Sequence, residues 1–231
     1  MPVIYDIGMH NGDDTDYYLT KGAEVVAVEA DPVLCSLAAQ RFAAFVESGR
    51  LTIVNAAVAD AVGRATFYRH REVSEWNTLV APKDPDMWES IEVDTAPLHS
   101  LIRHDAEIEF LKIDIEGYDF NALDSLDRAR LLPAHLSCEA HRVDIPCKLV
   151  AMGYTQFRLV NCKLQRKRLR RAVIKTLDGK QLRYSFSRAC SGPYGEDLQA
   201  PWLNSDQLIY TWSGRATLLG NGWYDIHAMR A

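Results

Sequence analysis

The sequence has no long apolar run, no basic excess and no regular cysteine spacing. None of its apolar stretches approaches the about 20 residues that cross a bilayer, so no membrane span is expected. Its 26 lysines and arginines are outnumbered by 31 aspartates and glutamates, which argues against a nucleic acid as the main partner. The five cysteines show no C-x-x-C spacing, so neither a disulfide framework nor a zinc site is indicated.

The sequence also has no internal repeat and no low-complexity tract. Its 231 residues, 48% of them hydrophobic, suffice for one good core, so we expect a single domain with insertions. The first predicted strand starts at Val3, which leaves no room for a signal peptide. We therefore expect a cytoplasmic protein.

Residues 3–31 have the pattern of a nucleotide-binding βαβ unit. Residues 3–7 form a short apolar run with one charge, as in a strand that is covered on both faces. Gly8 allows a sharp turn after this strand, and Gly12 allows the backbone to approach a ligand at the start of a helix. A second strand ends at Glu29, where a carboxylate can accept both hydroxyl hydrogens of a ribose.

The glycine turn favours a ligand without phosphates. It lacks the middle glycine of G-x-G-x-x-G, and Asp13 and Asp14 crowd the helix start, where they would repel a pyrophosphate. S-adenosylmethionine carries a sulfonium and an ammonium group, which these acids attract. The sequence therefore favours S-adenosylmethionine as cofactor. An NAD-dependent oxidoreductase and a non-catalytic module that binds an adenosyl ligand remain alternatives.

The α/β alternation continues to about residue 160. Hydrophobic periodicity and turn residues predict helices at 32–45, 97–104, 119–131 and 145–152, strands at 51–58, 65–68, 91–94, 110–115, 135–139 and 154–160, and a loop at 73–88. Beyond it, an Asp178-Gly179 turn between alternating apolar positions predicts a β-hairpin. We assign residues 1–161 to a cofactor-binding core, 162–222 to an insertion and 223–231 to a closing strand of one domain, 1–231.

Four motifs follow one another along the predicted core. They are Asp6-x-Gly8-x-x-x-Gly12, Glu29, Asn55-x-Ala57-Val58-x-Asp60 and Leu111-Lys112-Ile113-Asp114-Ile115-Glu116-Gly117-Tyr118. Their order and spacing over residues 3–160 resemble those of the FkbM-type S-adenosylmethionine-dependent methyltransferases. Residues 191–195 and 223–228 also look like a bacterial subgroup of that family. Met9 departs from the family pattern, which often has alanine there.

The resemblance implies the Rossmann-like class I methyltransferase fold, with a mainly parallel seven-stranded sheet whose last strand is antiparallel. It also implies O-methylation of a hydroxyl on a carbohydrate, glycolipid or related metabolite. It places Asp6, Gly8 and Gly12 at the methionine and ribose end of the cofactor, Glu29 at the ribose hydroxyls and Asp60 at the adenine amino group. The full set of expected cofactor-binding residues is Asp6, Gly8, His10, Asn11, Gly12, Thr15, Glu29, Ala30, Asp60 and Asp114.

Acids and histidines follow the central predicted strands, where methyl transfer would take place. Asp114 and Glu116 lie two residues apart, so they point the same way in a continuing strand, although both can instead cap the next helix. Glu139 and His141 follow the next strand, and His227 lies on the closing strand. Methyl transfer to a hydroxyl needs a group that takes the proton in the transition state. We expect His141 to be this base, with His227 as the reserve.

The same acids and histidines are adequate metal ligands, but no tight H-x-E-x-H spacing supports a metal site, and none is predicted.

The basic run at 163–171 is interpreted as a solvated hairpin, with a phosphate clamp as the alternative. We expect the acceptor to be a small molecule or a glycan and expect no nucleic acid partner. The oligomeric state is left open, and a homodimer is one option.

Overall fold

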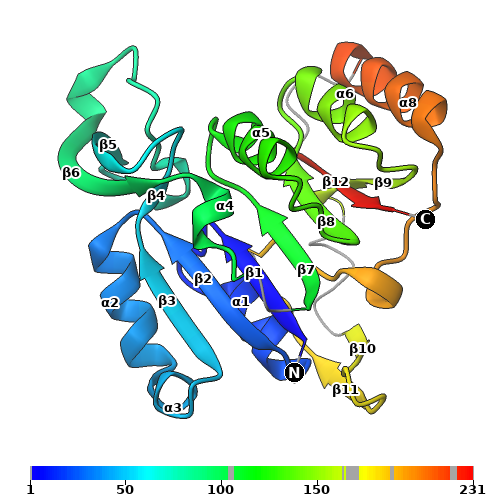
Figure 1. The fold of residues 1–231 in the computed structure, drawn as a ribbon, viewed down its shortest axis with the longest axis horizontal. Helices are drawn as coiled ribbons and strands as arrows, with labels where there is room; N and C mark the ends of the chain where they lie inside the picture. Colours follow the sequence, from blue (N-terminus) through cyan, green and yellow to red (C-terminus); the bar gives the residue numbers. More distant parts are fainter. Residues whose placement is uncertain are drawn as a thin grey trace.

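A computed structural model describes residues 2–103, 107–162, 164, 172–187, 190–218 and 223–230 (Figure 1). Its centre is a seven-stranded sheet with the strand order β3-β2-β1-β7-β8-β12-β9. The strands are β1 (Val3–Ile7), β2 (Glu24–Glu29), β3 (Leu51–Asn55), β7 (Ile108–Ile113), β8 (His135–Glu139), β9 (Gln156–Asn161) and β12 (Tyr224–Met229). Strand β12 is antiparallel to both neighbours, and the pairs among β1, β2, β3, β7 and β8 are parallel. The fold predicted from the family resemblance is confirmed.

Helices cover both faces of this sheet. They are α1 (Asp13–Thr20), α2 (Pro32–Arg41), α3 (Ala43–Glu47), α4 (Leu98–Leu101), α5 (Asp119–Ala129), α6 (Asp144–Ala151) and α8 (Ser205–Leu218). Tyr5 of β1 packs in the core under α4, α5, α6 and α8, whereas its neighbour Ile4 packs in the core under α1 and α2. The two-residue alternation of strand side chains therefore serves two cores.

The helix α8 lies within residues 162–222, the segment predicted as an insertion. It covers the sheet, and its Leu208 is fully buried in the main core. The sequence signal for this helix is weak. Large apolar side chains also lie on its exposed side, for example Tyr210, which is 84% exposed, so the apolar pattern of the helix is irregular. The predicted hairpin is present as β10 (Ala172–Lys175) and β11 (Gln181–Tyr184), packed on α1. The basic run at 163–171 lies outside the described residues, apart from Leu164.

A three-stranded sheet is added after β3. It has the order β4-β6-β5 and consists of β4 (Ala57–Val58), β5 (Gly63–His70) and β6 (Trp88–Ala96). The predicted strand at 51–58 is thus two strands in different sheets, and the predicted helix at 32–45 is divided into α2 and α3 at Phe42. The predicted loop at 73–88 contains two single-turn 3₁₀ helices, η1 (Ser74–Trp76) and η2 (Pro85–Met87).

The strand order reverses direction between β1 and β7. Such a reversal is called a topological switch point. In open α/β sheets, ligands bind there, outside the carboxyl ends of the strands. The carboxyl ends of strands β1, β2, β7 and β8 lie together at this edge of the sheet, and η1 lies beside them. No helix in the described part of the chain combines the length and the apolar character that crossing a membrane demands.

Candidate active site

A cavity of about 420 Å³ opens at the switch point. Its walls are the turn after β1, the ends of β2, β7 and β8, the start of the three-stranded sheet, η1, and Trp223 before β12. Of the residues predicted for the site, those that line it are Gly8, His10, Asn11, Glu29, Ala30, Asp114, Glu116, Glu139 and His141. The structure therefore brings together residues from four separate parts of the sequence.

Gly8 is required by the contact between β1 and β7. Its φ is +83°, and a Cβ added there would lie 1.8 Å from the carbonyl oxygen of Asp114. The N–H groups of Gly8 and Met9 both donate to the carbonyl oxygen of Val28 on β2, at 2.9 and 3.0 Å. The turn thereby fixes the ends of three strands at a distance that only glycine permits.

Glu29 lies at the end of β2 and is almost completely buried. One carboxylate oxygen accepts the N–H of Asp31 and the other accepts the N–H of His10, both at 2.8 Å. Burial raises the pKa of Glu29 to about 7, although the backbone hydrogen bonds act in the opposite direction. Each oxygen keeps a further acceptor position, so the carboxylate can accept two ligand hydroxyls at the cavity wall.

His10 connects the glycine turn to η1. Its φ is +53°, and its Nε2 lies 2.8 Å from the hydroxyl oxygen of Ser74. Burial lowers the pKa of the imidazole, so the side chain is neutral at physiological pH. His10 thus links η1, which follows β5 of the three-stranded sheet, to the glycine turn after β1.

Lys112 is a site residue to which the sequence analysis assigned no role. Its Nζ lies 3.4 Å from Asp6, 3.5 Å from Asp14 and 3.6 Å from Asp114, and it donates to the carbonyl oxygen of Gly8 at 3.2 Å. Burial acts to lower the pKa of Lys112, but the aspartates outweigh this effect and hold the pKa well above its usual value. The available signal was a lysine inside the otherwise apolar strand at 110–113, since a buried lysine requires acidic partners.

Four residues predicted to contact the cofactor do not line the cavity: Asp6, Gly12, Thr15 and Asp60. Asp6 and Thr15 are fully buried and bind each other at 2.7 Å, behind the glycine turn. Gly12 starts α1, where an added Cβ would meet the ring of Phe42 at 2.6 Å. Asp6 and Thr15 therefore support the glycine turn from behind in this structure, and Gly12 packs against Phe42.

Asp60 is an exposed residue that binds a side chain of α5. Its carboxylate accepts a hydrogen bond from the side-chain amide of Asn121 at 3.0 Å, which ties the turn after β4 to α5. Val58 and Phe67 of the three-stranded sheet contribute to the apolar part of the cavity wall. The sequence did not show this, because the sheet that carries Phe67 forms only through long-range pairing.

His227 is not at the site, which overturns its expected role as a reserve base. Strand β12 is antiparallel, so its later residues lie farther from the carboxyl edge: Asp225 pairs with Glu139 at the end of β8, whereas His227 pairs with Ser137. The imidazole is buried and stacks on Phe110, with ring centroids 5.9 Å apart. Burial lowers its pKa well below the usual value, so it is a neutral core residue.

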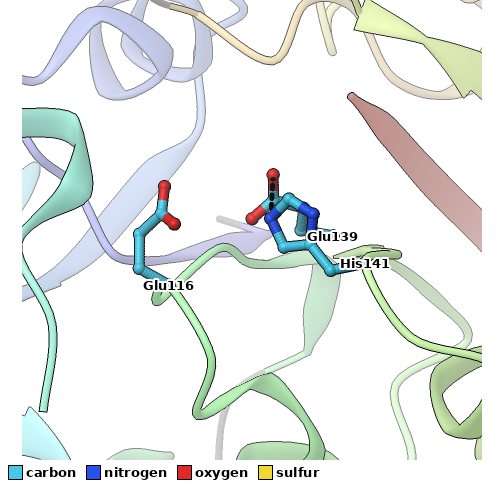
Figure 2. Close-up of side chains that lie close together, drawn as sticks. All are labelled: Glu116, Glu139 and His141. Atoms are coloured by element: carbon cyan, nitrogen blue, oxygen red, sulfur yellow. Dashed lines mark ion pairs between the residues drawn. The ribbon is translucent and has the colours of Figure 1, made fainter. Parts of the chain in front are cut away.

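Glu116, Glu139 and His141 gather at the ends of β7 and β8 (Figure 2). The Nε2 of His141 lies 2.8 Å from one oxygen of Glu139, and donor atoms of all three residues lie within 4.8 Å of one another. Burial, and then the charge of Asp114, raise the pKa of Glu116 to about 8 and that of Glu139 well above its usual value. Burial also lowers the pKa of His141. We call these three residues the acceptor cluster.

The acceptor cluster also borders a second, smaller cavity. This cavity has a volume of about 200 Å³ and is lined by Glu139, His141 and residues at the start of α5 and α6. The imidazole of His141 is half exposed, whereas the carboxyl group of Glu139 is buried. A molecule that entered from this side would meet the cluster before it reached the glycine turn.

The fold and the site together define the class of this protein. A sheet of this order with an antiparallel β12, a glycine turn after β1 and an acid at the end of β2 make up the Rossmann-like class I methyltransferase architecture. The cavity fits S-adenosylmethionine, since Glu29 is free to accept ribose hydroxyls and the surrounding acids match a cationic ligand.

The family follows from a direct comparison. The model of the methyltransferase FkbM domain matches residues 6–146, and the chain belongs to this family. It is a methyltransferase that depends on S-adenosylmethionine. No curated protein sequence matches the chain.

Solved structures with a similar arrangement include three bacterial methyltransferases. A precorrin-6y C5,15-methyltransferase from Geobacter metallireducens is 13% identical with a TM-score of 0.41, and the alignment covers 100% of this chain and 80% of that one. An O-methyltransferase from Thermotoga maritima is 11% identical (TM-score 0.43; coverage 100% and 59%). A 1,6-didemethyltoxoflavin N1-methyltransferase from Burkholderia thailandensis, solved with S-adenosylhomocysteine, is 13% identical (TM-score 0.43; coverage 100% and 72%).

Proposed function

We propose that this methyltransferase transfers its methyl group to a hydroxyl oxygen of a carbohydrate, glycolipid or related metabolite. The observation that carries the proposal is the position of the acceptor cluster, which faces the cofactor cavity beside Asp114. The carboxyl groups can hydrogen-bond a hydroxyl, and the neutral imidazole of His141 can take up its proton. A hydroxyl needs such a group, because its own pKa is far above that of any of these side chains.

The residues around the cavity have separate tasks in this reaction. Glu29 accepts the ribose hydroxyls, and Gly8 leaves room for the cofactor at the turn. Bound S-adenosylmethionine supplies a methyl carbon on a positively charged sulfur. The acceptor cluster would hold the acceptor hydroxyl for this methyl group, so that an O–C bond could form as the C–S bond breaks. The electron pair returns to sulfur, and the hydroxyl proton leaves at the cluster.

Trp76 supports a carbohydrate as the acceptor. It lines the cavity from η1, and 53% of its surface is exposed. An indole face at the rim of a polar cavity can stack on the apolar face of a sugar ring, while the acids below it bind hydroxyls. A Trp76→Ala variant is therefore expected to raise KM for a sugar acceptor and to leave the affinity for S-adenosylhomocysteine unchanged.

The test uses S-adenosylmethionine with a ¹³C-labelled methyl group and a panel of sugar, glycolipid and amine acceptors. We expect a new O-methyl resonance in the NMR spectrum with a hydroxyl acceptor. His141→Ala should lower kcat by about 10²- to 10⁴-fold, the range of a lost proton-transfer group, while calorimetry shows unchanged binding of S-adenosylhomocysteine. Methylation of nitrogen or carbon alone, or an unchanged kcat in His141→Ala, would contradict the proposal.

A further inference from the structure

We propose that the acceptor cluster of Glu116, Glu139 and His141 is a binding site for a divalent cation with mixed oxygen and nitrogen ligands. Among the described residues, it is the group whose carboxylate and imidazole donors converge closely enough to hold one ion. The inference rests on the proposed function for the purpose of the ion, but not for its binding. It assigns His141 a role as ligand in place of the proton-transfer role that the sequence predicts and the proposed function uses.

The geometry of the cluster matches a small cation. In an octahedral site with bonds of about 2.1 Å, neighbouring ligands lie about 3 Å apart and opposite ligands about 4 Å apart. The 2.8 Å separation between Glu139 and His141 is already that of neighbouring ligands, and all donors lie within 4.8 Å. Figure 2 shows the three side chains extending toward a common space. Small side-chain rotations therefore bring the donors onto one ion.

The second observation is an unsatisfied oxygen on Glu139. The side chain of Glu139 is 3% exposed, yet its Oε2 has no hydrogen-bond partner among the described residues. A buried carboxylate oxygen without a donor is costly, and natural structures normally satisfy such groups with protein, water or an ion. Since Oε1 is the atom that meets His141, a cation at the cluster gives Oε2 the electropositive partner that the chain does not supply.

No positively charged side chain of the described residues pairs with the two glutamates of the cluster. In the described part of the chain, no lysine or arginine lies within 4.0 Å of the carboxylate of Glu116 or Glu139. The buried Lys112 is directed to Asp6, Asp14 and Asp114 instead. The carboxyl oxygens of the two glutamates, with His141 beside Glu139, are therefore not occupied by a positively charged side chain of the described chain and are available as ligands.

The ion has a place in methyl transfer. It lies where the large cavity meets the smaller one, since Glu139 and His141 line both. Three protein ligands leave coordination positions open for the acceptor. The ion binds the hydroxyl oxygen and lowers the pKa of the hydroxyl, and the proton passes to water on the exposed side of His141. The acceptor oxygen then attacks the methyl carbon, so that the O–C bond forms, the C–S bond breaks and the electron pair returns to sulfur.

Binding is tested with Mn²⁺ alone as the probe, by electron paramagnetic resonance titration in the presence of S-adenosylhomocysteine. We expect one site per chain. Glu139→Gln and His141→Ala should each weaken Mn²⁺ binding by about 100-fold or more, since even supporting residues behind metal ligands contribute 10- to 100-fold. Glu47→Gln is the matched control: Glu47 is an exposed glutamate at the end of α3 that lines neither cavity, so its loss should change the affinity less than about twofold.

Calorimetry with S-adenosylhomocysteine shows that each variant retains a folded site. An absence of Mn²⁺ binding at millimolar concentration in a protein that binds S-adenosylhomocysteine would overturn the inference, as would equal Mn²⁺ affinity in wild type and Glu139→Gln. Treatment with EDTA separates this inference from the proposed function. Full O-methylation after EDTA treatment removes the role of the ion but leaves O-methylation standing. Tight Mn²⁺ binding without O-methylation of any acceptor leaves the site standing and removes the proposed function.

Discussion

Two groups of acids in and behind the cavity wall differ in their partners. On the β1 side, Asp6, Asp14 and Asp114 surround the buried Lys112, so the chain itself provides the compensating charge. On the β8 side, Glu116 and Glu139 have only the neutral His141 beside them. Acids of the first kind hold the backbone of the turn in place. Acids of the second kind are arranged for a charge that arrives from outside the chain.

Glu29 stands between these two cases. Its oxygens accept two backbone N–H groups, which hold the carboxylate in position without neutralising it. Burial therefore raises its pKa to about 7, and a ligand hydroxyl can complete its hydrogen bonding. The comparison predicts that substitutions on the compensated side unfold the protein, while substitutions on the uncompensated side change what it binds.

The largest loss of stability is expected for Gly8→Ala. The added Cβ would overlap the carbonyl oxygen of Asp114, and the φ of +83° is unfavourable for alanine, so we expect a loss of more than about 4 kcal/mol in the free energy of unfolding. Gly22→Ala is the matched control, because its φ is +94° but no atom lies within 4 Å of the added Cβ. It should cost about 1 kcal/mol. Urea unfolding of both variants measures the difference, and equal losses would contradict the close-contact argument.

Lys112→Met should cause the next largest loss in the free energy of unfolding. Removing one partner of a buried ionic cluster costs about 3–5 kcal/mol, because the buried Asp6 and Asp14 and the partly buried Asp114 remain without a cation. Lys175→Met is the control, since the pair of Lys175 with Glu196 is exposed and should contribute less than about 0.5 kcal/mol. Urea unfolding again provides the measurement. A Lys112→Met protein as stable as the control would show that the compensated side does not depend on its lysine.

The smallest effect concerns the pH dependence of cofactor binding. Burial raises the pKa of Glu29 to about 7, and the ionised form is the one that accepts two ribose hydroxyls, so affinity is lost as the pH falls through 7. Because about one tenth of Glu29 is ionised at pH 6 and about nine tenths at pH 8, S-adenosylhomocysteine should bind about tenfold more weakly at pH 6. Calorimetry measures this change, and Glu29→Gln should bind weakly at both values. The same pH dependence in Glu29→Gln would assign it to another group.

Local chemistry in the sequence determined much of this protein. The apolar strand, the Gly8 turn and Glu29 are consecutive features whose geometry depends on neighbouring residues, and the structure has them where the pattern predicts. The Asp178-Gly179 hairpin follows for the same reason. The order of motifs also sufficed to indicate the family, because each motif carries its own backbone requirement.

Only the tertiary structure decided which charged groups meet. Lys112 finds Asp6 and Asp14 from a strand more than 90 residues away, and the antiparallel register of β12 removes His227 from the site. The convergence of Glu116 with Glu139 and His141 depends on β7 and β8 lying side by side. Side-chain periodicity fixes the face of a strand on which a residue lies, but the partner across that face is set by register and strand order, which involve residues far apart in the chain.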